Sequence, residues 1–261
     1  MTAGGRVADY DSVAAGYDRR YAIHEYAGVR GTLLGFVGEA GALLEVGCGT
    51  GHWLAALASQ TPSSSRRRFV AGVEPAAEMI ARARAASSGA HLVRARAEAL
   101  PWRDASFDRV FCVNALHHFS DRVRFFAEAR RILKPGGGLL TIGKDPHTGH
   151  DSWWVYDYFP ETMDIDRQRF ARVRDLRGEL VLAGFAWTES FEADCIEATM
   201  PAGEALATGV VDRAYTSQLT VLSDEEFERG AARIREADAA AGGELRLATD
   251  FRLYAAVGWL A

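Results

Sequence analysis

The sequence predicts an α/β protein in which helices flank a doubly wound, mostly parallel sheet. Three observations indicate this class. Short apolar segments alternate with helical segments between residues 42 and 143, which is typical of successive β-α units. The first apolar segment, residues 42–46, runs into a turn with three glycines in five residues (47–51). The second ends at Glu74, so a carboxylate lies at the sheet edge where open α/β proteins bind ligands.

Two helices are expected before the first strand. Residues 9–21 form the first, and its Tyr10, Val13 and Tyr17 recur at spacings of three and four, which gives one aromatic face. Residues 24–37 form the second. The aromatic face either packs on the edge of the sheet or folds over a ligand, and both interpretations stay open.

The glycine turn limits which ligand can bind. Gly47, Gly49 and Gly51 can take φ angles that side chains forbid, and without Cβ atoms they let a ligand approach the backbone N–H groups. A dinucleotide-binding turn would read G-x-G-x-x-G, but the sixth position from Gly47 is His52. A Walker phosphate loop would end in G-K-[ST], and here Trp53 follows His52. An NAD(P)-dependent oxidoreductase is therefore a disfavoured alternative.

Further strands and helices follow in alternation. Glu74 lies 27 residues after Gly47, so one β-α-β turn of chain brings it back beside the glycine turn. A carboxylate there can accept hydrogen bonds from both hydroxyls of a ribose, whereas the simpler interpretation is a charge at a helix start. The glycine turn upstream favours the ribose. The expected strands are 69–74, 91–96, 109–113 and 139–143, with helices at 51–58, 76–86 and 121–133.

The order of four motifs identifies a family resemblance. Residues 45–51 read E-V-G-C-G-T-G, 97–108 read A-E-A-L-P-W-R-D-A-S-F-D, 114–119 read N-A-L-H-H-F, and 131–138 read R-I-L-K-P-G-G-G. From residue 10 to about 144 the chain resembles the UbiE-like (methyltransferase type 11) branch of class I S-adenosylmethionine-dependent methyltransferases. The resemblance implies a Rossmann-like sheet of seven strands with the last one antiparallel. It also implies S-adenosyl-L-methionine as cofactor and S-adenosyl-L-homocysteine as product.

The resemblance implies a cofactor site along the carboxyl ends of the strands. The glycine turn would admit the amino-acid half of the cofactor, and Glu74 would take the ribose. Asn114 would close the fourth strand beneath the sulfonium. The residues expected to contact the cofactor are Tyr17, Glu45, Gly47, Cys48, Gly49, Gly51, Glu74, Pro75, Met79, Ala97, Glu98 and Asn114.

Arg96 departs from the family pattern. Relatives commonly read G-D-A-E at the end of the third strand, where the Asp helps to hold the adenine amino group, and this chain reads A-R-A-E at 95–98. The backbone N–H of Ala97 can still meet an adenine ring nitrogen, Glu98 can serve the amino group, and Arg96 could stack on the ring. The departure keeps open a second alternative, a non-methylating protein of this fold that binds or rearranges a small molecule.

Two adjacent histidines are the candidate catalytic residues. Methyl transfer from a sulfonium needs mainly the positioning of donor and acceptor. An acceptor hydroxyl or amine must also lose a proton, and His117 and His118 are the titratable pair nearest the expected methyl position. The resemblance favours His117. A packed or helix-capping histidine is the simpler interpretation, and Tyr156, Tyr215 and Glu25 are alternative bases.

Beyond residue 144 the resemblance weakens. A helix is expected at 172–183, a strand within 185–200, two helices within 201–241 and an antiparallel last strand at 251–260. His147, His150 and Asp151 lie in a loop without further ligands nearby, so no metal is expected. We expect a single domain with a helical cap over the carboxyl edge of the sheet. Its parts are a core of about 40–144 and 171–261, an N-terminal lid of about 9–38, and cap elements of about 145–170 and 201–241.

Composition narrows the expected partners. The 261 residues carry a formal net charge of −5, which does not favour binding to nucleic acid or to an anionic membrane. No apolar run reaches the length of a membrane span and no signal peptide is evident, so we expect a soluble cytoplasmic protein. The expected partner is a small-molecule acceptor, methylated on oxygen, nitrogen or carbon, with a role in specialised metabolism. A monomer or a homodimer is expected.

Overall fold

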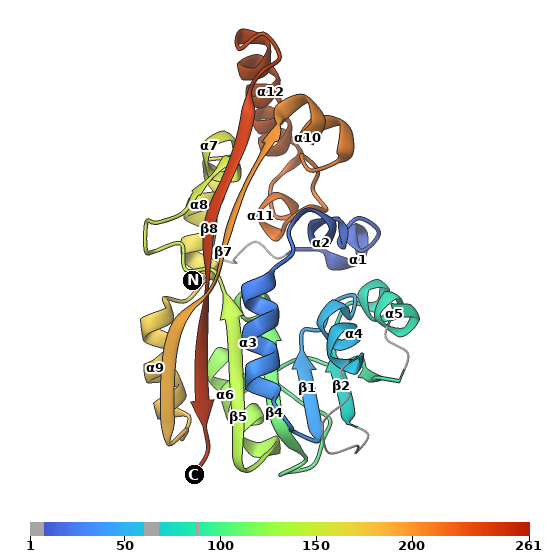
Figure 1. The fold of residues 1–261 in the computed structure, drawn as a ribbon, viewed down its shortest axis with the longest axis vertical. Helices are drawn as coiled ribbons and strands as arrows, with labels where there is room; N and C mark the ends of the chain where they lie inside the picture. Colours follow the sequence, from blue (N-terminus) through green and yellow to red (C-terminus); the bar gives the residue numbers. More distant parts are fainter. Residues whose placement is uncertain (1–7, 60–67, 87–88) are drawn as a thin grey trace.

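The computed structural model, which describes residues 8–59, 68–86 and 89–261, is organised around one mixed sheet (Figure 1). The strand order is β3-β2-β1-β4-β5-β8-β6, and β7 pairs with β8. Strands β1 to β5 are parallel, and β8 is antiparallel to both β5 and β7. The predicted α/β class is therefore confirmed. The strands are β1 (Ala42–Val46), β2 (Phe69–Val73), β3 (His91–Val93), β4 (Phe107–Val113), β5 (Leu133–Gly143), β6 (Ser152–Trp153), β7 (Trp187–Pro201) and β8 (Arg246–Trp259).

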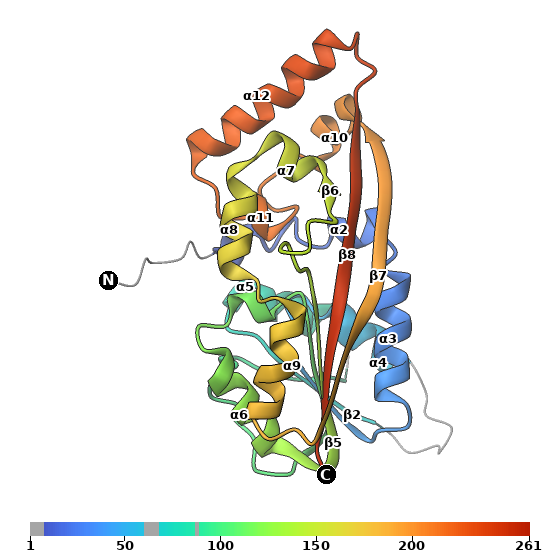
Figure 2. The same ribbon diagram turned by 90° about the vertical axis from the view of Figure 1, so that its left-hand side faces the viewer.

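Helices cover both faces of the sheet. Figure 2 shows α3 (Ala27–Val37) and α4 (His52–Ala58) on one face, and α6 (Arg122–Ile132) and α9 (Val173–Leu182) on the other. Neighbouring side chains of β1 enter different cores: Leu43 packs in the core that includes α3 and α4, and Leu44 in the core that includes α6 and α9. This alternation is the two-residue period of a strand that is buried on both faces.

The N-terminal segment forms two short helices, where the sequence predicted one over 9–21. They are α1 (Tyr10–Val13) and α2 (Arg19–Ile23). The break falls around Gly16, where a Cβ would lie 2.8 Å from the Cβ of Ala214. The next helix begins later than expected, at Ala27, because Tyr26 takes a left-handed conformation with φ 49°. This segment lies over the carboxyl edge of the sheet, between the core and the cap (Figure 1).

The cap is larger than the sequence predicted, because the last two strands continue past the sheet. Their pairing runs from Trp187 opposite Trp259 to Pro201 opposite Arg246. The long β7–β8 ribbon carries α10 (Ala202–Thr208) and α12 (Asp224–Ala240) beyond the carboxyl edge (Figures 1 and 2). Three helices, not two, lie within 201–241. The remaining helices are α5 (Ala77–Ala86), α7 (Trp154–Tyr158), α8 (Glu161–Arg169) and α11 (Ser217–Thr220).

Within the described ranges, no helix combines the length and the apolar character that crossing a membrane would require.

Candidate active site

The glycine turn between β1 and α4 is fixed by the neighbouring strand. Gly47, Gly49 and Gly51 all take positive φ, at 75°, 52° and 84°. The N–H groups of Gly47 and Cys48 both donate to the carbonyl of Val73, at 2.8 and 3.0 Å. A Cβ on Gly47 would lie 2.5 Å from the Cβ of Ala115, so a side chain there would require the backbone to shift. The turn therefore keeps its backbone open to a ligand.

Glu74 follows β2 and holds its carboxylate beside the glycine turn. Its Oε2 accepts from the N–H of Gly49 at 3.0 Å, and its Oε1 accepts from the N–H of Ala76 at 2.9 Å. Burial raises the pKa of this carboxyl, while the two N–H groups oppose the rise. Each oxygen keeps a further lone pair for a ligand.

A cavity of about 620 Å³ opens between the glycine turn, the ends of β2 to β4 and α1; we call it the cofactor cavity. Nine of the twelve residues expected to contact the cofactor line it, and Arg96 does too. Glu98 belongs to this lining, but its Oε1 also accepts hydrogen bonds from Ser120 and from the N–H of Asp121. The nine are Tyr17, Gly47, Gly49, Glu74, Pro75, Met79, Ala97, Glu98 and Asn114.

The other three expected residues do not line this cavity. Glu45 is buried and accepts from the N–H of Leu54 at the start of α4, and burial raises the pKa of its carboxyl well above the usual range. Cys48 is buried too, and its Sγ points toward Gly72 of β2. Gly51 donates its N–H to the carbonyl of Cys48 and precedes α4. These three residues support the turn from the side of the protein core.

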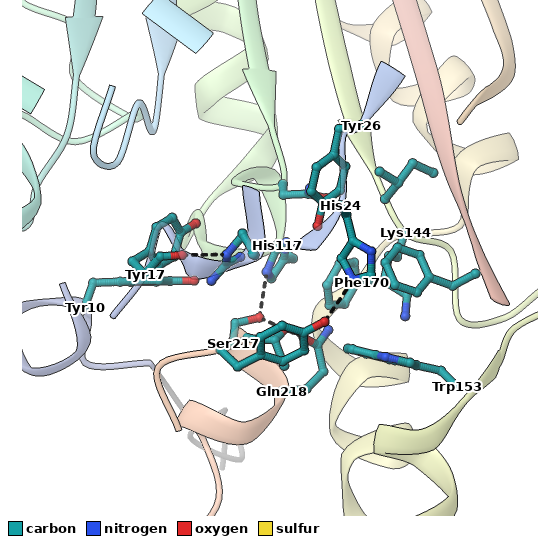
Figure 3. Close-up of a pocket in the computed structure, with 16 residues that line it drawn as sticks. Tyr10, Tyr17, His24, Tyr26, His117, Lys144, Trp153, Phe170, Ser217 and Gln218 are labelled. Atoms are coloured by element: carbon teal, nitrogen blue, oxygen red, sulfur yellow. Dashed lines mark hydrogen bonds between the residues drawn. The ribbon is translucent and has the colours of Figure 1, made fainter. Parts of the chain in front are cut away.

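A second cavity, of about 540 Å³, lies on the cap side and is called the acceptor cavity here (Figure 3). It shares Tyr10, Tyr17 and Asn114 with the cofactor cavity, so the two meet at the end of β4. Asn114 takes a left-handed conformation with φ 50° there, and its N–H donates to the carbonyl of Ile142. The acceptor cavity is further lined by Arg20, His24, Tyr26, His117, Lys144, Trp153, Phe170, Tyr215, Thr216, Ser217, Gln218, Phe251 and Leu253.

The two adjacent histidines face different cavities from the short 3-10 helix η1 (Leu116–His118). His117 lines the acceptor cavity, stacks on Phe170 at 3.9 Å, and holds Nε2 3.4 Å from the Oγ of Ser217. His118 lines the cofactor cavity, where its Nε2 pairs with the hydroxyl of Tyr10 and its Nδ1 lies 3.4 Å from Arg169. Burial lowers the pKa of both imidazoles well below the usual value, and Arg169 adds to the effect.

The alternative bases are placed less favourably. Glu25 is exposed and lines neither cavity. Tyr156 is buried and donates its hydroxyl to Asp166 at 2.8 Å, away from the cavity. Tyr215 lines the acceptor cavity, and its hydroxyl is hydrogen-bonded to His24.

The loop histidines do not gather around a metal site. His147 directs its Nε2 to the carbonyl of Phe170, and Asp151 lies beside Lys144. Within the described part of the chain, the side chains close enough to share an ion are Cys195, Glu197 and Asp250, on the outer β7–β8 ribbon.

Several residues of the acceptor cavity were not predicted from the sequence. Lys144 directly follows β5, and its Nζ lies 3.8 Å from the ring centroid of Trp153. Arg20 places its guanidinium 3.7 Å from the ring centroid of Tyr17. Ser217 comes from α11 in the cap. The sequence offered one signal for Lys144: it is one of only two lysines among 30 basic residues, and it lies at the end of a predicted strand.

The parallel sheet brings a glycine turn and a strand-end carboxylate to one cavity, and a second cavity lies beside it under the cap. This arrangement is typical of nucleoside-binding α/β folds. Residues 44–141 match the family model of a methyltransferase domain. The phthiotriol/phenolphthiotriol dimycocerosates methyltransferase of Mycobacterium leprae is 30% identical over 162 residues, covering 61% of this chain and 56% of that protein. The chain spans about half the length, or less, of the curated relatives it matches.

Solved structures share the fold. A candidate methyltransferase from an antibiotic biosynthesis pathway of Anabaena variabilis gives a TM-score of 0.68 at 22% identity, covering 87% of this chain and 95% of that chain. Phosphoethanolamine N-methyltransferase 2 of Haemonchus contortus, solved in complex with S-adenosyl-L-methionine, gives 0.59 at 16% identity, covering 96% of this chain and 57% of that chain. The matched part of this chain, residues 44–141, is similar to class I S-adenosylmethionine-dependent methyltransferases of the type 11 branch.

Proposed function

We propose that this protein transfers a methyl group from S-adenosylmethionine to a small molecule held in the acceptor cavity. The observation that carries the proposal is the junction of the two cavities, where Tyr10, Tyr17 and Asn114 line both. A donor on the side of the glycine turn and an acceptor on the cap side would meet there. The Mycobacterium leprae relative, named as a methyltransferase of phthiotriol compounds, supports an organic acceptor and a role in specialised metabolism.

The residues of the cofactor cavity fit S-adenosylmethionine. Gly49 takes a positive φ, and a Cβ there would lie 3.8 Å from the ring of Tyr17, which is where the cofactor's amino-acid half needs room. Glu74 is held by two backbone N–H groups and can accept from the ribose hydroxyls. Met79 and Ala97 would flank the adenine. When bound, the cofactor supplies a methyl group activated by a positively charged sulfur.

The chain itself contributes orientation and proton removal. Fixing donor and acceptor in one geometry can supply about 7–11 kcal/mol of the barrier. Tyr17 and Asn114, at the junction, would position the reacting ends and exclude water. His117 would accept the proton of an acceptor hydroxyl or amine, because its lowered pKa keeps the imidazole neutral near pH 7. Ser217, 3.4 Å from its Nε2, would help to hold the acceptor.

Calorimetry with S-adenosylhomocysteine and with NADH tests the cofactor, and transfer of label from S-adenosylmethionine to a panel of small acceptors tests the reaction. Binding of the homocysteine product but not of NADH, followed by labelled product, is the expected result. Folded protein that binds no S-adenosylhomocysteine would overturn the proposal. Binding without transfer to any acceptor would favour the non-methylating alternative. The absence of nucleic-acid substrates, the cytoplasmic location and a monomeric or dimeric state stay predictions.

A further inference from the structure

The acceptor cavity is lined by positive charge and aromatic rings. Its described lining includes Arg20 and Lys144 and contains no Asp or Glu, although the whole chain carries a net charge of −5. Burial lowers the pKa of both His24 and His117, so neither imidazole adds a charge near neutral pH. No ion pair of the described residues involves Arg20, whose guanidinium lies over Tyr17. Asp151, which does not line the cavity, forms an ion pair with Lys144 at 3.5 Å, so Arg20 is the uncompensated positive charge of the lining, and its field favours an anion.

Lys144 is a buried ammonium with a single carboxylate neighbour, Asp151, at long range. Its side chain is 6% exposed, and its Nζ lies within 3.8 to 4.7 Å of the ring centroids of Trp153, Phe251 and Tyr156. Asp151 forms a buried ion pair with it at 3.5 Å, a long contact that can engage at most one of the three N–H donors. An ammonium offers three donors, and the rings can satisfy none of them as an oxygen would.

Trp153 contributes an unpaired donor to the same cavity. Among the buried side-chain polar atoms without a hydrogen-bond partner in the described ranges, two belong to residues that line the acceptor cavity: Nζ of Lys144 and Nε1 of Trp153. Both residues are fixed by the sheet, because Lys144 directly follows β5 and Trp153 pairs with Thr249 of β8. Figure 3 shows the two side chains on the same side of the cavity. Buried donors left unpaired are costly, so their coincidence in one cavity indicates a ligand.

We infer that the acceptor is a carboxylic acid, whose carboxylate accepts hydrogen bonds from Lys144 Nζ and Trp153 Nε1. The inference rests on the proposed function, because it names the substrate class of that same site. The methylated atom is then at the other end of the acceptor, toward the junction at Tyr17 and Asn114. The ring of Phe170, which stacks on His117, and the other aromatic walls favour a flat molecule.

The same contacts disfavour an amine acceptor. Three rings that could bind an ammonium by cation–π attraction are already occupied by Lys144. An incoming ammonium would also meet the like charges of Lys144 and Arg20, which is the repulsive element that makes a site selective.

Three probes that share a hydroxyphenyl ring and differ in the charge of one substituent test whether the cavity prefers a carboxylate. 3-Hydroxybenzoate, 3-hydroxybenzamide and 3-hydroxybenzylamine are titrated by calorimetry into protein saturated with S-adenosylhomocysteine. The acid is expected to bind at least about tenfold more tightly than the amide, and the amine more weakly than both. Equal binding of acid and amide, or no binding of the acid, in protein that binds S-adenosylhomocysteine overturns the inference. Failure to bind S-adenosylhomocysteine overturns the proposed function instead.

A charge-neutral double variant tests the residues. Lys144→Met with Asp151→Asn removes the ammonium without leaving Asp151 as an unpaired buried charge, and it should abolish the preference for acid over amide. The matched control is Lys134→Met with Asp108→Asn, which removes the chain's other lysine together with its ion-pair partner at 2.8 Å. The control should keep the preference.

Trp153→Phe gives a second readout, because it keeps a ring and removes only the N–H. It should reduce the preference for the acid while S-adenosylhomocysteine affinity stays unchanged. A preference that survives both the Lys144 double variant and Trp153→Phe contradicts the assignment, and so does an equal loss of preference in the Lys134 control.

Discussion

The imidazole of His24 and the hydroxyl of Tyr215 form a buried hydrogen bond of 2.9 Å across 191 positions of sequence. His24 lies between α2 and α3, and Tyr215 lies just before α11, so the bond links the N-terminal lid to the cap. Both residues line the acceptor cavity. They also line a third, mostly apolar cavity of about 490 Å³ under α10. The pair therefore forms part of the wall between these two spaces.

Tyr215→Phe should lower the stability of the protein and leave its affinity for the cofactor unchanged. The variant keeps the ring but leaves His24 buried without its partner, which costs about 1–3 kcal/mol. For a protein of this size, each kcal/mol lowers the unfolding temperature by about 2–4 °C, which scanning calorimetry can measure. The affinity for S-adenosylhomocysteine should not change, because neither residue lines the cofactor cavity. Tyr158→Phe is the control, and equal unfolding temperatures in both variants would contradict the prediction.

Glu74→Gln should lower the affinity for S-adenosylhomocysteine by about tenfold or more, because it replaces charge-assisted hydrogen bonds to the ribose with neutral ones. The amide keeps the size of the side chain but replaces one acceptor oxygen with a donor that faces the N–H of Gly49 or Ala76, so the loss combines the removed charge with a lost backbone contact. Calorimetry measures the affinity. Glu78→Gln, an exposed position four residues further along, should leave it unchanged. Parent affinity in Glu74→Gln would remove this residue from the ribose role.

The same residue predicts a pH dependence of cofactor binding. Because burial raises the pKa of Glu74, its carboxylate takes up a proton at a higher pH than an ordinary glutamate does. The ionised form is the one that accepts from the ribose on both oxygens, so affinity should fall as pH is lowered through this raised pKa. Glu74→Gln should bind equally well across the same range. A parent affinity that does not depend on pH there would be evidence against the assignment.

Glu45→Gln tests the correction that Glu45 lies outside the cofactor cavity. The buried carboxyl of Glu45 has a raised pKa, so the native state favours its protonated form and loses stability as pH rises above the pKa of the unfolded chain. The substitution should therefore raise the unfolding temperature, and more at about pH 8 than at about pH 5. S-adenosylhomocysteine affinity should change far less than in Glu74→Gln. A loss of affinity as large as that of Glu74→Gln would place Glu45 in contact with the cofactor.

The backbone frame of the cofactor cavity could be predicted because three of its residues follow strand ends directly and the fourth, Ala97, lies in the turn after β3. Gly47, Glu74, Ala97 and Asn114 come after β1, β2, β3 and β4 in order. Parallel strands end at the same edge of a sheet, so position along the chain is enough to bring these residues together. All four line the cavity, and the binding role of each stays a prediction.

The direction of individual side chains could not be predicted. Strand β1 is buried on both faces, so its sequence lacks the polar and apolar alternation that would reveal which way Glu45 points. Cys48 belongs to the glycine turn, where positive φ angles on both sides reorient the chain. Both residues consequently face the core, although their motif suggested the ligand.

The acceptor cavity was largely hidden from the sequence, because its walls come from segments far apart in the chain. Lys144 follows β5, Trp153 lies in β6, and Ser217 begins α11. Only the folded cap brings these three residues together. Both strands of the β7–β8 ribbon were expected, but the earlier start of β8 at Arg246 and the pairing of the two strands beyond the sheet were missed for a related reason. The outer half of the ribbon is stabilised by pairing between two strands that are more than 40 residues apart, such as Pro201 with Arg246, and short-range patterns carry little information on such pairing.

His117 gives the sharpest test of proton removal. Its imidazole stacks on Phe170 and faces Ser217, and desolvation, followed by His118 and Arg169, lowers its pKa well below about 6.5. Neutral imidazole is the form that accepts a proton, so a lowered pKa keeps His117 competent at a lower pH than a free histidine. The rate of methyl transfer should therefore stay level as pH falls through about 6.5 and decline only well below it. His117→Asn should slow transfer by about a hundredfold or more and remove that decline.

Two measurements separate this role from simple packing. If His117 acts as the base, His117→Asn keeps the parent affinity for S-adenosylhomocysteine, because His117 does not line the cofactor cavity. His91→Asn, at an exposed histidine on β3, controls for the loss of an imidazole elsewhere and should keep the parent rate. If His117 only packs against Phe170, His117→Asn lowers the unfolding temperature while the rate per folded molecule stays at the parent value at every pH. That second pattern would contradict the base assignment and direct the search to Tyr215, the remaining alternative that lines the acceptor cavity.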